Sequence, residues 1–109
     1  MKTSEFVKIR VTVPEEYAAK VREMLGKLGA GQQGQYDFCS FSCKGMGRFR
    51  PRSGANPAIG KIDVLEEVNE EIVEVICHQT LVREVITGLK KVHPYEEPAI
   101  DILPRLEIE

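Results

Sequence analysis

Long apolar runs, export signals and paired cysteines are missing from this chain. No stretch of about 18 or more apolar residues is present, which excludes a membrane-spanning helix. The first residues pass directly into alternating apolar and charged positions, without the apolar segment of a signal peptide. The three cysteines are an odd number, so we expect reduced thiols rather than disulfides. These absences predict a cytoplasmic protein without membrane contacts.

An excess of charge of one sign is also missing. The chain has 15 Lys and Arg against 17 Asp and Glu, giving a formal net charge of −2 at pH 7. This balance excludes a nucleic-acid binder that depends on bulk positive charge. The 109 residues are 42% hydrophobic and 29% charged, and no repeat, linker or low-complexity segment divides them. They predict one globular domain over residues 1–109 with a modest core.

Residue sets typical of catalysis do not stand out either. His78 and His93 are the only histidines, and no Ser–His–Asp set, Cys–His–Asn set or pair of carboxylates can be located. Residues Gly29–Gly34 match the pattern G-x-G-x-x-G, but they follow a predicted helix and precede a predicted strand, the reverse of a dinucleotide site. We interpret them as a helix cap and a turn. No catalytic residue and no cofactor are predicted.

Apolar periodicity predicts six elements in the order strand, helix, strand, strand, helix, strand. Their expected ranges are Val7–Val13, Pro14–Leu28, Tyr36 to about Cys43, Lys61 to about Cys77, Thr80–Val92 and Ala99–Leu103. Thr80 is the predicted N-cap of the second helix. The order predicts an α+β, ferredoxin-like βαββαβ fold, in which a four-stranded antiparallel sheet carries both helices on one face.

The central hairpin, about residues 36–77, is longer than so small a sheet needs. Part of it would project from the sheet with unpaired backbone edges, and such edges are usually covered by another chain. The sequence therefore predicts a symmetric homo-oligomer.

A loop rich in Gly, Pro and Arg is expected between Lys44 and about Gly60. Its glycines let backbone amides approach an anion closely, and arginine forks suit phosphate or carboxylate. Solvated surface charge is the alternative interpretation. The residues predicted to bind a small anionic ligand are Arg48, Arg50 and Arg52, with Asn56 as a hydrogen-bonding partner and Tyr95 at the cleft edge.

The densest cluster of functional groups is His93–Ala99. Its imidazole, phenol and carboxylates suit a divalent cation, with His93 and Glu96 as the candidate ligands. Copper or zinc would fit a histidine combined with a thiolate better than magnesium would. The alternative is structural, because a histidine in the last helical turn complements the helix dipole and two prolines fix a rigid turn.

Two further groups of residues are interpreted without a site. Cys39, Cys43 and Cys77 are expected to be buried thiols that behave as small hydrophobic residues. The acidic stretch Glu66–Glu74 is expected to solvate a hairpin arm, or to pair across an interface with the basic loop of a neighbour.

Three blocks of sequence resemble a known family. They are Gly31–Phe41, the run Gly45–Pro51 continuing in Gly54–Gly60, and His93–Ala99. In this order they resemble the domain inserted in bacterial members of the Nif-three-like dinuclear-metal family, over nearly the whole chain. The ending His93–Pro104 also resembles the CutA divalent-cation-tolerance proteins. The resemblance implies a PII/CutA-like fold, here as a stand-alone chain, and favours a trimer as the homo-oligomer.

The resemblance also limits the expected chemistry. In the two-domain relatives, the paired metals are held by histidines and acids of the flanking domain, which this sequence lacks. We therefore expect a non-catalytic, oligomeric PII/CutA-like module that acts as a regulator or sensor by binding a small anionic ligand between subunits. Two alternatives stay open: a divalent-metal-binding protein that uses the His93-Pro94-Tyr95-Glu96 turn, and a structural interaction module for a partner protein.

Overall fold

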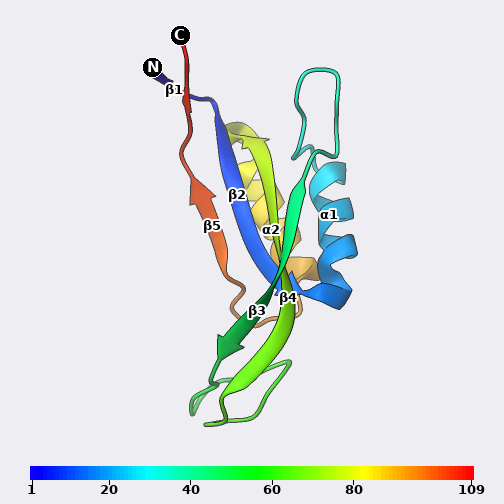
Figure 1. Cartoon of the computed structure of the whole chain (residues 1–109), viewed down its shortest axis with the longest axis vertical. Coiled ribbons are helices and arrows are strands. Elements are labelled where there is room, and N and C mark those ends of the chain that lie inside the picture. Colours follow the sequence, from blue (N-terminus) through cyan, green and yellow to red (C-terminus); the bar gives the residue numbers. More distant parts are fainter.

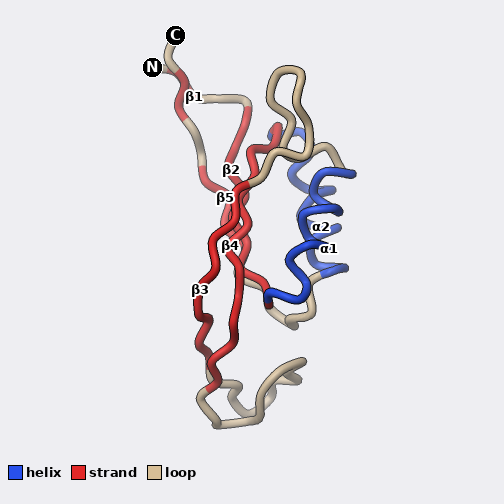
Figure 2. Tube along the Cα trace, turned by 45° about the vertical axis from the view of Figure 1, so that its right-hand side comes forward, coloured by secondary structure: helices blue, strands red, loops and turns tan.

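The computed structural model describes residues 1–109, and it contains two helices and two antiparallel sheets. A four-stranded sheet has the strand order β3-β4-β2-β5, and a two-stranded sheet pairs β1 with β6 near the chain ends. The elements are β1 (Lys2–Thr3), β2 (Phe6–Pro14), α1 (Ala18–Lys27), β3 (Phe41–Phe49), β4 (Glu66–His78), α2 (Val82–Val92), β5 (Ile100–Leu103) and β6 (Leu106–Glu107). Both helices cover one face of the larger sheet (Figures 1 and 2). The predicted α+β, ferredoxin-like fold is confirmed.

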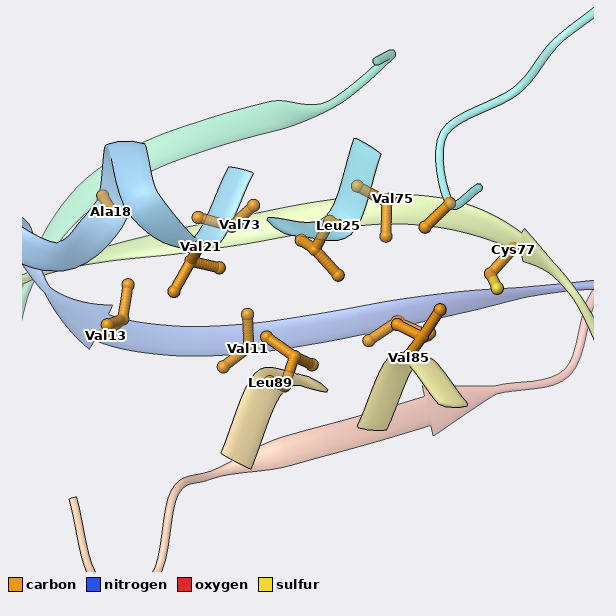
Figure 3. Close-up of a cluster of buried hydrophobic side chains, with 12 residues drawn as sticks. Val11, Val13, Ala18, Val21, Leu25, Val73, Val75, Cys77, Val85 and Leu89 are labelled. Atoms are coloured by element: carbon orange, nitrogen blue, oxygen red, sulfur yellow. The ribbon is translucent and has the colours of Figure 1, made fainter. Parts of the chain in front are cut away.

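Strand alternation explains where the core lies. Ile9, Val11 and Val13 on β2 point toward the helices and are fully buried. On the same face of β4, Val73, Val75 and Cys77 are at most 4% exposed. Figure 3 shows these side chains meeting the apolar stripes of the two helices. The remaining large members of this cluster are Val21 and Leu25 from α1, Val73, Val75 and Cys77 from β4, and Val85 and Leu89 from α2.

The residues that alternate with these core positions lie on the opposite, helix-free face of the sheet, which we call the open face. On β2 and β4 they are Lys8, Arg10, Thr12, Glu70, Ile72, Glu74 and Ile76. Phe41 of β3 pairs with Glu74, and Gly45 pairs with Glu70, so both belong to this face. Phe41 is 65% exposed there.

The position of the second strand is a correction. The sequence predicted a strand from Tyr36 to about Cys43 followed by a loop from Lys44, but β3 runs from Phe41 to Phe49. Each residue from Lys44 to Phe49 has a partner on β4, so the pairing overrides the low strand propensity of Gly45 and Gly47. The true loop is 50–65, and residues 36–40 precede the strand.

The start of the second helix is also corrected. α2 begins at Val82, after a 3-10 turn over Gln79–Leu81, so Thr80 is not its N-cap. The Thr80 backbone N–H instead donates to Nδ1 of His78 at 3.2 Å. His78 thus caps the turn from the end of β4, because the strand delivers its ring next to the unpaired amides.

Three of the five glutamates in the acidic stretch of β4 form ion pairs within the chain. Arg48 Nε lies 2.8 Å from Glu67, and Arg22 lies 2.9 Å from Glu71. Lys8 of β2 lies 3.5 Å from Glu74. Basic residues of β2, β3 and α1 therefore pair with these three carboxylates.

The prediction that the cysteines are buried is only partly confirmed. Cys77 is buried as expected, whereas the expectation is wrong for Cys43, which is exposed because it alternates onto the open face of an edge strand. Cys39 is half-buried. No helix in the structure combines the length and the apolar composition needed to cross a bilayer.

The β3–β4 hairpin runs beyond the ends of both helices, as Figure 2 shows. This projection was predicted from the length of the segment, and it gives the molecule extents of 50 × 25 × 23 Å. The distal part of the hairpin thus has no helix beneath it, and its contacts come from loops.

Leu89→Ala tests the packing of α2 on the sheet. Leu89 is fully buried, so its truncation should lower the free energy of unfolding by about 2 to 5 kcal/mol through lost burial and a residual cavity. Urea denaturation of both proteins measures the difference. The neighbouring exposed residue is the control: Lys90→Ala should change stability by less than about 0.5 kcal/mol. Equal effects of the two substitutions would contradict this account of the core.

Candidate functional site

The site begins where α2 ends. His93 follows the last residue of α2 in an extended conformation, and it is 5% exposed. Its Nε2 donates to the carbonyl oxygen of Thr12 on β2 at 2.7 Å, and its Nδ1 accepts from the backbone N–H of Tyr95 at 3.1 Å. A carbonyl can only accept, so the ring is the neutral tautomer with the proton on Nε2. These two bonds fix the path of the chain between α2 and β5.

Tyr95 carries this connection to β4. Its hydroxyl donates to Oε2 of Glu70 at 2.6 Å, and its ring packs edge-on against Phe49 with the centroids 5.5 Å apart. Glu70 is 7% exposed. A Cβ added at Gly47 would fall on the Glu70 carboxylate, so the absence of a side chain on β3 makes room for this contact.

Burial shifts the pKa values of both aromatic groups. Desolvation lowers the pKa of His93, and the hydrogen bond to Thr12 and the charge of Glu70 only partly oppose it. Burial raises the pKa of Tyr95, and the hydrogen bond to Glu70 and its negative charge add to the shift. Both groups are therefore neutral at pH 7, and the network holds its shape through hydrogen bonds rather than ion pairs.

A cavity of about 1150 Å³ lies beside this network. It is bounded by the distal part of the β3–β4 hairpin, by the open-face side of β2, and by the connection from α2 to β5. The loop 50–65 closes one end, where the backbone N–H of Asn56 donates to both carboxylate oxygens of Glu96 at 3.1 and 3.3 Å. The loop 50–65 and the connection from α2 to β5 are thus in contact at one end of the cavity.

Most of the residues predicted to bind a ligand line this cavity. They are Arg48, Arg50, Arg52, Tyr95 and Glu96. Asn56 lies next to the cavity but is not part of its lining, and His93 is buried beneath Tyr95. Glu71 and Glu97 line the cavity as well, and the sequence analysis missed two charged lining residues of the open face, Arg10 and Glu70. The only signal for them is strand alternation, which places both on the open face once the register of β2 and β4 is known.

The arginines of the cavity differ in what they contact. Arg48 pairs with Glu67, and both side chains are more than half exposed, so this pair contributes little stability. Arg10, Arg50 and Arg52 form no ion pair within the chain. Three guanidinium groups therefore face the cavity and its rim with their donors unused by other side chains.

The predicted metal ligands are engaged in other contacts. Both ring nitrogens of His93 hold hydrogen bonds, and the Glu96 carboxylate accepts the Asn56 amide. No group of three or more His, Cys, Asp or Glu side chains is arranged to hold a metal ion. A metal at His93 would have to displace the Thr12 or the Tyr95 contact, and a metal role stays a prediction.

Known proteins are similar to this chain in sequence and in fold. No protein-family model matches the chain. Two proteins named GTP cyclohydrolase 1 type 2 homolog, from Halalkalibacterium halodurans and Bacillus subtilis, are each 44% identical to it over 102 residues, covering 94% of this chain and 27% of theirs. The crystal structure of a Bacillus cereus protein related to NIF3 matches with a TM-score of 0.81 and 39% identity, over 96% of this chain and 27% of that one. The chain is homologous to one segment of the NIF3-related proteins.

The chain spans about a quarter of the length of these relatives. The predicted resemblance to the Nif-three-like family is thereby confirmed. The periplasmic CutA of Archaeoglobus fulgidus has a TM-score of 0.69 at 19% identity, and the match covers 95% of this chain and 87% of that one. At this identity the likeness to CutA concerns the fold alone.

Gly47→Ala tests the contact between β3 and Glu70. The new methyl group would push the Glu70 carboxylate away from Tyr95, and we expect a loss of about 1 to 3 kcal/mol in the free energy of unfolding. Gly45→Ala is the matched control, because nothing lies within 4 Å of a Cβ there. Urea denaturation should show Gly45→Ala at least as stable as the original chain. Identical stability of the two variants would contradict the placement of Glu70.

The buried, neutral state of His93 predicts a pH dependence of stability. Because its folded pKa lies below the unfolded value of about 6.5, the unfolded chain takes up the proton first. The contribution of neutral His93 to the free energy of unfolding is complete above about pH 6.5, and it declines as the pH falls toward the folded pKa. Urea denaturation between pH 7.5 and 5.5 should show a larger loss for the original chain than for His93→Gln, whose amide can still donate to Thr12. A parallel loss in both proteins would count against this assignment.

Proposed function

We propose that the chain is a non-catalytic, homo-oligomeric PII/CutA-like module that binds a small anionic ligand in the cavity beside Tyr95. The observation that carries this proposal is the set of three arginines, Arg10, Arg50 and Arg52, that line one cavity without forming ion pairs. Guanidinium groups bind carboxylate and phosphate through paired hydrogen bonds, and these three exposed arginines are accessible to such a ligand. A regulatory or sensing role follows if ligand binding changes the loop 50–65.

The cavity has the size and composition of a small-molecule site. Its volume of about 1150 Å³ is slightly above the usual range for ligand pockets, which is roughly 300 to 1,000 Å³. Phe49, Pro51 and Ile59 supply apolar surface next to the arginines. Such a combination suits a ligand with an apolar body and an anionic group.

The open face supports the oligomeric part of the proposal. Phe41 is 65% exposed and Leu103 is 41% exposed, and both belong to this face by register. β3 is also an edge strand. Exposed apolar surface beside an unpaired edge is typical of a surface that another subunit covers. The resemblance to PII and CutA proteins favours a trimer, and the cavity, which extends onto the open face, would then lie at the clefts between subunits.

The relatives carry the name of a GTP cyclohydrolase homologue, although this chain matches only 27% of their length. We assign this segment a binding role rather than a catalytic one, and GTP is therefore among the anions to test. We also place the module in the cytoplasm, where the exposed thiol of Cys43 would stay reduced.

Calorimetric titration tests the ligand part of the proposal with inorganic phosphate, citrate and GTP. At least one anion should bind, and replacing both loop arginines, Arg50→Gln with Arg52→Gln, should weaken its affinity about tenfold or more, since charged hydrogen bonds are lost. Arg83→Gln is the matched control, because Arg83 is an exposed arginine on α2 outside this cavity. At a ligand concentration a hundred times the dissociation constant, the protein should gain about 2.7 kcal/mol of stability.

Equal weakening by Arg83→Gln would contradict a site in the cavity. Absence of binding for all three anions would contradict the ligand part of the proposal, and it would favour the structural interaction module that the sequence left open. A partner chain that co-purifies with the protein would support that alternative.

Light scattering coupled to size exclusion tests the oligomer. At micromolar concentration the mass should be about three times the 12.3 kDa of one chain. Phe41→Lys should dissociate the assembly, because it places a charge in the surface that becomes buried. Tyr36→Lys is the control, since Tyr36 is 76% exposed and lies outside the sheet. A monomer mass for the original chain would contradict the proposal.

A further inference from the structure

Four carboxylates line the cavity together with the arginines, those of Glu70, Glu71, Glu96 and Glu97, and Glu70 is the most buried of them. It is 7% exposed and lines the cavity from the open-face side of β4. Its Oε2 accepts the Tyr95 hydroxyl, whereas Oε1 accepts no hydrogen bond from the chain. Every side-chain oxygen or nitrogen that is sealed from solvent has a hydrogen-bond partner. Because Oε1 has none, it is not sealed, and the cavity gives access to it.

The Glu70 carboxylate is also held in place before any ligand arrives. The Tyr95 hydroxyl fixes Oε2 at 2.6 Å, and the space left by Gly47 receives the carboxylate group. Oε1 has no donor from the chain, so a cation or an N–H donor of a ligand can form a charge-assisted hydrogen bond with it. Oε1 is thus a fixed acceptor for a positively charged or donor group.

The other acidic residues of the lining are Glu71, which pairs with Arg22, Glu96, which accepts the Asn56 amide, and Glu97. The lining also carries positive charge. Arg50 and Arg52 enter the cavity from the loop, and Arg10 enters from β2, all without ion pairs. A ligand that carries only negative charge would bind the arginines but meet the carboxylate of Glu70 in the same cavity. A ligand with one negative and one positive group can pair with the arginines and with Glu70 at the same time. Charge complementarity therefore favours such a ligand.

We infer that the cavity takes a zwitterionic small molecule, whose amine is bound by Oε1 of Glu70 and whose phosphate or carboxylate is bound by the arginines of the cavity. The inference rests on the proposed anion site and adds the class of ligand. Glu70 acts as the residue that determines specificity, since it favours an anion that also carries an amine over the same anion without one.

Two matched series of phosphonates test this inference. Aminoalkylphosphonates with two, three and four carbons between the amine and the phosphorus are titrated against the full chain by calorimetry, and the alkylphosphonates of the same lengths serve as references. Several lengths are used because the series then covers a range of separations between the two charged groups. We expect at least one aminoalkylphosphonate to bind about tenfold more tightly than its reference, as a charged hydrogen bond allows.

Glu70→Gln should remove this preference and raise the affinity for the alkylphosphonates, because the carboxylate charge that repels them is lost. The glutamine oxygen can still accept the Tyr95 hydroxyl, and retained alkylphosphonate binding shows that the cavity is intact. Glu74→Gln is the matched control, because Glu74 is on the same face of the same strand but does not line the cavity. It should keep the preference for the amine.

The outcomes separate this inference from the proposed function. If the alkylphosphonates bind and the amine gives no gain at any length, the zwitterion inference is overturned and the anion site stands. If the gain survives Glu70→Gln, its assignment to Glu70 is wrong. If no phosphonate of either series binds, the anion site itself is contradicted, and the inference is overturned with it.

Discussion

The hydrogen bond from His93 to the Thr12 carbonyl is the contact on which the site depends. It lies where α2 has ended and the chain must return to the sheet, and the Pro94 that follows prevents the helix from continuing. The second ring nitrogen accepts the Tyr95 amide, which fixes the direction of the next residues. Tyr95 can then reach Glu70 on β4. One buried, uncharged imidazole thus joins the end of α2 to β2, Tyr95 extends this junction to β4, and the cavity lies beside it.

The long hairpin supplies the other half of the site. The distal part of β3 and β4 extends past the two helices, so no helix covers it (Figure 1). Phe49 packs on Tyr95, and the loop 50–65 is tied to Glu96 through the Asn56 amide. Because no core fills this region, a cavity can form there. Binding residues usually lie on loops that a rigid scaffold positions.

Much of the fold could be predicted, because alternating β-branched residues such as Val7–Val13 and the apolar stripes of the helices report local periodicity. The extent of β3 could not, since Gly45 and Gly47 have low strand propensity and only pairing with β4 orders them. The arginines of the loop and Tyr95 were recognisable as functional residue types. Arg10 and Glu70 were not, because their place in the cavity depends on strand register, a property of the assembled sheet.

The tautomer of His93 tests the central claim most directly. Nitrogen-15 NMR of the imidazole distinguishes a proton on Nε2 from one on Nδ1 and from the doubly protonated ring. The structure predicts a neutral ring at pH 7 with its proton on Nε2, donated to Thr12, and with Nδ1 as an acceptor. A proton on Nδ1, or a ring protonated at both nitrogens at pH 7, would contradict the junction on which the cavity rests.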